Sequence, residues 1–271
     1  MKSHIQIPKG LLKQFSHKII VTQNGHINKV DAVYALNIKE KSIIEEKINS
    51  FGTIENYFSD EIDKQILNKK VENPFCDVTS IIKTQIEKLK RNQVTLRQKE
   101  KNALYKFCQY SHLRAPRQIN SLNNDNFMRA LNIKLTPSEF IDMADKSPFM
   151  TNPFSGRLIA IIKNETAVNF VIPFHCIYLI DVRENISDVR RDIIILPFTP
   201  KYAIALLPIK DNQKQQLDII NLTSEEKVSV MNDWAFRTEL TNRQYLIATE
   251  DKELKKYADI LDEIDNENHV T

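Results

Sequence analysis

The chain is poor in glycine, cysteine and long apolar runs, and each shortage excludes a class of function. It has only four glycines, so the glycine-rich phosphate loops of nucleotide-binding enzymes are not expected. Its cysteines, Cys76, Cys108 and Cys176, are too widely spaced to predict a disulfide framework or a paired zinc motif. No run approaches about 18 apolar residues, and no apolar leader follows Met1, which predicts a soluble, cytoplasmic protein without membrane contact.

Positive and negative charges are nearly balanced along the chain. The 271 residues include 38 Lys and Arg against 35 Asp and Glu, a net charge of +3, so local basic patches are allowed but a strongly basic arm is not. Hydrophobic residues make up 42% and charged residues 27%, which is ordinary for a folded protein with a sizeable core. Since no linker rich in proline, serine or glycine interrupts the chain, we expect one compact domain over residues 1–271.

The distribution of apolar runs predicts an α+β fold. Residues 1–40 are typical of a β-hairpin around the turn dipeptide Asn24-Gly25, and residues 55–147 are typical of helices. Residues 148–271 predict a sheet followed by a helix, a strand and a final helix. The strand runs are 157–162, 167–172, 176–180, 193–196, 202–207 and 245–248. Because strands and helices are segregated, a C-terminal mixed or antiparallel sheet packed against helices is favoured over a doubly wound α/β fold.

Capping residues predict where the helices begin: Ser59, Thr95 with its capping-box partner Gln98, and Thr136 with Glu139. The helix that begins at Thr95 should end near Arg114, because Pro116 disfavours helical backbone at the residue before it. A separate helix is expected over residues 77–90.

Short motifs recur in a fixed order along nearly the whole chain. They are His4 with Pro8 and 11–15, then 55–58, then 107–116, then 149–153 with 196–200, and finally 230–232 with 245–248. In this order they resemble the family called domain of unknown function 4238, which is uncharacterised and mainly bacterial. The resemblance implies a site but no known chemistry.

The chain departs from the family pattern in two of these motifs. The Arg-Thr-Pro of the family is Arg114-Ala115-Pro116 here, and the acid of its Ser-Asp-Asn-Pro turn is replaced by Thr151, before Asn152 and Pro153. If that acid is a base or a metal ligand in relatives, this chain has lost it and binds without turnover. If the acid only caps a turn, threonine can take its place.

The resemblance makes His4, Gln109 and Arg114 the catalytic candidates, and Arg114, Gln109, Asn152 and Thr151 the ligand-binding candidates. Gln109 and Arg114 lie about 140° apart around one predicted helix. A guanidinium suits a phosphate or carboxylate, but Arg114 could equally hold a neighbouring loop or cap its own helix. His4 would need a carboxylate partner for acid–base chemistry, which the sequence does not identify, so a structural hydrogen bond is the alternative.

Signatures of known enzymes are missing. The sequence contains no His-Glu-x-x-His, Gly-x-Ser-x-Gly, Cys-x-x-Cys or Gly-x-Gly-x-x-Gly motif. His112 has no motif around it, and the adjacent His175 and Cys176 would face opposite ways on a strand. We therefore expect no metal and no cofactor.

Basic residues are dense between Lys83 and Lys106. They are Lys83, Lys88, Lys90, Arg91, Arg97, Lys99, Lys101 and Lys106. This stretch is either an electrostatic footprint for nucleic acid or a solvated helix face, since Glu87 and Glu100 lie within it.

Two hypotheses about function follow. In one, the protein is a binding module for a small anionic ligand or a nucleic acid, with an anion-binding pocket around Arg114. In the other, it is a nuclease or toxin-like effector of bacterial anti-phage defence. The sequence makes no prediction of oligomeric state.

Overall fold

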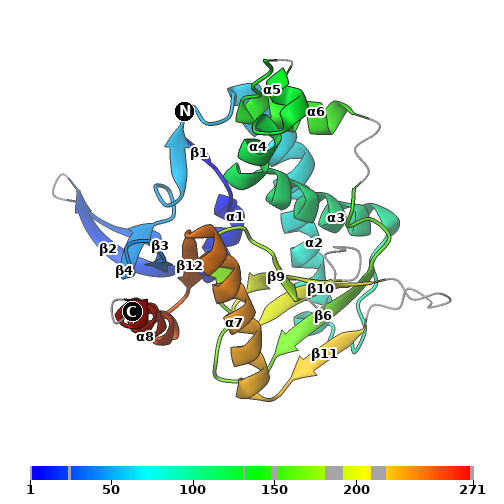
Figure 1. Ribbon diagram of the computed structural model, residues 1–271. Coiled ribbons are helices and arrows are strands. Elements are labelled where there is room, and N and C mark those ends of the chain that lie inside the picture. Colours follow the sequence, from blue (N-terminus) through cyan, green and yellow to red (C-terminus); the bar gives the residue numbers. More distant parts are fainter. Residues whose placement is uncertain are drawn as a thin grey trace.

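A computed structural model of the chain describes residues 2–23, 26–130, 132–147, 152–180, 192–208 and 218–268. It has the predicted α+β architecture, in which helices pack against sheets (Figure 1). Figure 1 shows most of the middle helices gathered at one end, and the N-terminal hairpin at one side.

The N-terminal part of the chain is mostly β. Its elements are β1 (Lys2–His4), α1 (Lys9–Leu12), η1 (Lys13–Phe15), β2 (His17–Gln23), β3 (His26–Asn37), β4 (Ser42–Lys47) and β5 (Thr53–Glu55). Strands β2 and β3 pair antiparallel, from His17 opposite Ala32 to Gln23 opposite His26, so the predicted hairpin is confirmed. Its turn at Asn24-Gly25 lies outside the described residues. Strand β1 pairs with β5, which fixes the position of His4.

A long helical stretch follows, made of η2 (Ile62–Glu72), α2 (Asn73–Lys83) and η3 (Thr84–Lys88). The Ser59 hydroxyl accepts a hydrogen bond from the Ile62 N–H at 3.3 Å, as expected of a cap. The two helices predicted for this region are continuous, because η2 runs directly into α2. The prediction of two separate helices in this region was therefore wrong.

The next helix, α3 (Gln98–Leu113), begins later than predicted. Gln85 accepts a hydrogen bond from the Thr95 N–H and donates one to the Thr95 carbonyl, each at 2.9 Å. These bonds hold Thr95 outside the helix, so the predicted capping box at Thr95 was wrong. Glu100 instead accepts from the Arg97 N–H at 2.7 Å.

Three shorter helices complete this region: α4 (Pro116–Asn123), α5 (Asn126–Ala130) and α6 (Pro137–Lys146). The cap predicted for α6 is confirmed, because the Thr136 N–H donates to the Glu139 carboxylate at 2.8 Å and the Thr136 hydroxyl accepts from the Glu139 N–H at 3.3 Å.

The C-terminal part contains a mixed sheet in the order β11-β6-β10-β9-β8. Its strands are β6 (Leu158–Asn164), β8 (Tyr178–Ile180), β9 (Ile193–Thr199), β10 (Tyr202–Leu207) and β11 (Ile219–Leu222). Strand β11 runs parallel to β6, whereas the other neighbours are antiparallel. One face packs against the apolar side chains of α2 and α3, and the other packs against α7 (Glu225–Asn242). Burial of both faces explains the unbroken apolar runs in these strands.

A late strand joins the N-terminal hairpin. Strand β12 (Tyr245–Ala248) pairs with β3 and with β7 (Ile172–Pro173), giving a hairpin sheet in the order β2-β3-β12-β7 with β4 on β3. The strand expected over residues 167–172 is thus reduced to its last residue, Ile172, with Pro173. Helix α8 (Lys252–Asn268) lies beside β3, β4 and β12. Distant parts of the sequence therefore form one sheet.

Of the helices in the described residues, none is long and apolar enough to cross a membrane.

An aromatic cluster joins the hairpin sheet to the N-terminal segment. The rings of Phe51, Phe174 and Tyr245 meet edge to face, with centroids 5.2 to 5.7 Å apart. Next to Phe51, Gly52 has a φ of +62°, and a Cβ added there would come within 2.6 Å of the Phe174 ring. Both the backbone conformation and the close ring require glycine at this position.

We expect Gly52→Ala to lower the free energy of unfolding by about 1–3 kcal/mol, through overpacking and left-handed backbone strain. Gly10→Ala is the control, because its Cβ would meet only the Cys76 Sγ, at 3.0 Å, and alanine favours the helix there. Chemical denaturation measures both. Equal losses for the two variants would contradict the role assigned to the Phe174 contact.

Candidate functional site

A cleft lies between the start of α4 and the C-terminal half of α7. It consists of two cavities of about 390 and 570 Å³, which share Arg117, His175, Thr241 and Asn242 in their walls. We term this hollow the α4–α7 cleft. One wall is apolar, with Phe154, Ile177, Tyr178 and Leu179, and most of the other lining residues are polar.

Segments that are far apart in the sequence meet at this cleft. Gln6 comes from the opening segment, Ala115 and Pro116 from the end of α3 and the start of α4, and Pro153 from the turn after Asn152. These are three of the segments on which the family resemblance rests. Their convergence makes the cleft the strongest candidate for a functional site.

Arg114 directly precedes Ala115, which lines the cleft, and it holds the converging segments together. Only 2% of its surface is exposed. Its guanidinium pairs with the Glu72 carboxylate at the end of η2 and donates to the Gln6 carbonyl at 3.3 Å. Arg114 thus links α3, η2 and the N-terminal segment, which fits the structural alternative. Direct contact between Arg114 and an anionic ligand stays a prediction.

His4 belongs to the same polar cluster. Desolvation lowers the pKa of His4 below its usual value, Glu72 opposes this change, and Lys9 and Arg114 add to it. The charge of Glu72 therefore acts on His4, but His4 Nδ1 has no hydrogen-bond partner within the described residues. The structure brings His4 and Arg114 into the same neighbourhood, since the charge of each of Glu72 and Arg114 influences the His4 pKa.

Several buried polar atoms in this region have no hydrogen-bond partner within the described part of the chain. They are Ser3 Oγ, His4 Nδ1, both amide atoms of Gln6, Arg114 Nε and Glu239 Oε2. Gln6 is 1% exposed. Unpaired buried polar atoms are rare in packed cores, so their concentration here is typical of a site and not of a core.

His175 is oriented by a buried carboxylate. Glu239 of α7 is fully buried, and its Oε1 lies 2.9 Å from His175 Nδ1 and 3.2 Å from the His175 backbone N, which donates to it. When His175 is neutral, donation from Nδ1–H to Glu239 leaves Nε2 as a proton acceptor. The His175 ring lines both cavities of the cleft.

Sequence reasoning missed Glu239, although a signal was present. Val228, Met231 and Ala235 were assigned to the apolar face of α7, and Glu239 lies one further turn along that face. An acid at an apolar-face position indicates a buried charge, which requires a partner.

Two further groups lie close to His175. His112 is at the cleft wall, where its ring meets Phe154 edge to face with centroids 6.3 Å apart. Desolvation, and then the charge of His175, lower the pKa of His112. Cys176 is fully buried, its Sγ lies 3.8 Å from the Gln6 carbonyl, and burial raises the pKa of its thiol, so it is not a nucleophile at neutral pH.

The remaining predicted residues lie differently. Asn152 Oδ1 accepts from the Phe154 N–H at 2.9 Å, so it caps the turn at the cleft rim. Gln109 is half-buried on α3 and lines neither cavity of the cleft. Thr151 lies outside the described residues. Within the described ranges, no group of three or more His, Cys, Asp or Glu could hold a metal ion.

Comparison with known families agrees with the sequence motifs. The family model described as protein of unknown function (DUF4238) matches residues 4–238, which is most of the chain. The chain therefore belongs to this family. Searches of curated proteins and of solved structures gave no match.

The lowered pKa of His4 predicts a pH dependence of stability. The folded state favours the neutral form of His4. Its contribution to the free energy of unfolding is therefore fully present above the unfolded pKa of about 6.5, and it is lost as the pH falls through the lower folded pKa. We expect the free energy of unfolding to fall between pH 7 and pH 5, and His4→Gln to reduce this slope.

Denaturation at a series of pH values measures the slope, and the variant of the exposed His26 on β3, His26→Gln, is the control. If the His4→Gln and His26→Gln variants show the same slope of unfolding free energy against pH, His4 is not buried in its neutral form.

Proposed function

We propose that this protein is a binding module for a small ligand with an apolar body and an anionic or polar head, held in the α4–α7 cleft. The observation that carries the proposal is the convergence of three distant segments on a cleft that is lined in part by Gln6, whose two buried amide atoms have no partner within the described residues. In this proposal the ligand lies beside Arg114, whose side chain is buried.

The cleft offers distinct contacts to the two ends of such a ligand. Phe154, Ile177 and Leu179 would pack against its apolar body. The exposed Arg117, which lines both cavities, would pair with its anionic head. His175 Nε2, turned into an acceptor by Glu239, would bind a hydroxyl or amine of the ligand.

A second candidate function is acid–base catalysis in the same cleft, as the nuclease or toxin-like hypothesis requires. The observation in its favour is the buried Glu239 that orients His175, because general bases are commonly held by a carboxylate in this way. The burial of Cys176 removes one possible nucleophile. A role in bacterial defence stays an expectation from the sequence.

Ligand binding can be tested with a panel of small anions that contains inorganic phosphate, AMP, glucose 6-phosphate and benzoate. We expect at least one member to bind, and Arg117→Ala to weaken its binding about tenfold, equivalent to ~1.4 kcal/mol. Isothermal titration calorimetry measures the affinity, and chemical shifts of the His175 ring locate the site.

The matched control is Arg129→Ala, which removes an exposed arginine of α5 that does not line the cleft. The α4–α7 cleft is not the binding site if Arg129→Ala weakens the binding of every ligand as much as Arg117→Ala does. The same holds if no bound ligand changes the chemical shifts of the His175 ring.

A further inference from the structure

A second hollow, separate from the cleft, runs beside α2 and η3. It consists of two cavities of about 290 and 600 Å³, which share Glu87 in their walls. The first lies between η1 and α2, and the second lies beside β6, β10 and β11. We term the two together the basic groove. No residue lines both the basic groove and the α4–α7 cleft.

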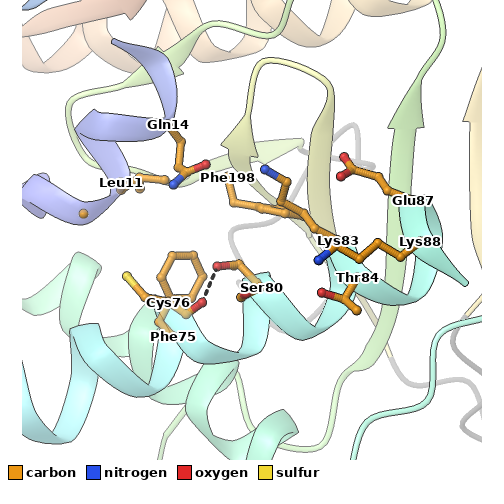
Figure 2. Close-up of a pocket in the computed structure, with 12 residues that line it drawn as sticks. Leu11, Gln14, Phe75, Cys76, Ser80, Lys83, Thr84, Glu87, Lys88 and Phe198 are labelled. Atoms are coloured by element: carbon orange, nitrogen blue, oxygen red, sulfur yellow. Dashed lines mark hydrogen bonds between the residues drawn. The ribbon is translucent and has the colours of Figure 1, made fainter. Parts of the chain in front are cut away.

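Side chains from two elements face each other across the first cavity. Figure 2 shows Gln14 on the η1 side, and Ser80, Lys83, Thr84 and Lys88 on the helical stretch opposite. Phe75 and Phe198 form part of the lining but are only 2% and 1% exposed. The surface of this cavity combines polar and apolar groups, and its charges come from Lys83, Glu87 and Lys88.

Positive charge dominates the walls of the groove. The basic lining residues are Lys83, Lys88, Lys90, Arg91 and Lys163, and Glu87 is the one acidic residue among those lining it. Within the described chain, no carboxylate lies within 4.0 Å of the amines of Lys83, Lys88 or Lys90. Lys163 pairs with Glu165 at 2.6 Å. Unpaired ammonium groups in a hollow attract an anionic partner.

The structure divides the basic stretch that was noted in the sequence. Arg97 is paired with Glu100 and Lys106 with Asp145 at 3.1 Å, so these charges are neutralised locally. In contrast, Lys83, Lys88, Lys90 and Arg91 line the groove together. Lys99 and Lys101 line neither cavity, so the groove gathers four of the eight basic residues of the stretch.

We propose that the basic groove binds the sugar–phosphate backbone of a single nucleic-acid strand. Lysine and arginine neutralise phosphates, and hydroxyl and amide groups donate hydrogen bonds to phosphate oxygens. The groove supplies the second kind of group as well: Gln14, Ser80, Thr84, Asn92 and Asn221. A hollow lined from two sides admits an extended strand, whereas a duplex presents a convex surface.

Other polyanions fit these walls less well. A membrane surface requires apolar side chains that insert into the lipid, and the aromatic residues of the groove are buried. Glu87, at the junction of the two cavities, would repel a continuous row of carboxylates as in an acidic peptide. A strand can place a sugar or base at this position and phosphates on either side.

The test is fluorescence anisotropy with a labelled 20-nucleotide oligo(U) and with oligo(dT) of equal length, in 50 mM salt. The groove variant carries Lys83→Gln, Lys88→Gln and Lys90→Gln. We expect binding by the wild type, at least tenfold weaker binding by the groove variant, and a salt-dependence slope smaller by about two, since each phosphate contact on a single strand contributes ~0.7.

The control variant makes the same change of charge at exposed lysines away from the groove, Lys39→Gln, Lys227→Gln and Lys255→Gln. Thermal melting of both variants verifies that they fold. The proposal is overturned if neither oligonucleotide binds, if the control variant loses as much affinity as the groove variant, or if poly-glutamate of equal length competes as well as unlabelled oligo(U). Because the groove and the cleft share no lining residue, these outcomes leave the ligand-binding proposal for the cleft unaffected.

Discussion

The buried pairing of Arg114 with Glu72 and the Gln6 carbonyl is the interaction on which the candidate site depends. Removing two charges from water costs several kcal/mol, so such a pair persists only where its geometry and further hydrogen bonds offset that cost. Here the pair joins the end of α3, the end of η2 and the N-terminal segment. Arg114 is followed by Ala115 and then by Pro116, the first residue of α4. The contacts of Arg114 therefore position one wall of the α4–α7 cleft.

The α4–α7 cleft and the basic groove differ in what they can bind. The cleft combines an apolar wall with His175 and Glu239, and it is suited to a compact ligand held from several sides. The basic groove is lined by Lys83, Lys88 and Lys90, which have no carboxylate partner within the described residues, and it is suited to an extended polyanion. A protein with both features would bind a nucleic-acid strand in the groove and a small molecule in the cleft. Loss of binding at one site would leave binding at the other intact.

Local sequence patterns predicted the helices and strands better than the tertiary contacts between them. The caps at Ser59 and Thr136 were confirmed because they depend on residues a few positions apart. The cap predicted at Thr95 failed because the side chain of Gln85, ten residues away, bonds the Thr95 backbone N–H and carbonyl. The pairing of β12 with β3 could not be predicted, since an apolar run identifies a strand but not its neighbour. Likewise, motifs pointed to His4 and Arg114, whereas Glu72 and Glu239 acquire their importance only through tertiary contacts.

If Arg114 and Glu72 act as one buried pair that joins the segments around the cleft, their contributions to stability are coupled. A double-mutant cycle of Arg114→Met, Glu72→Met and the combined variant, followed by chemical denaturation, tests this coupling most directly. Each single variant should lose about 3–5 kcal/mol of unfolding free energy, because it leaves one buried charge unpaired, and the combined variant should recover most of that loss. A combined loss equal to the sum of the single losses would contradict the coupling.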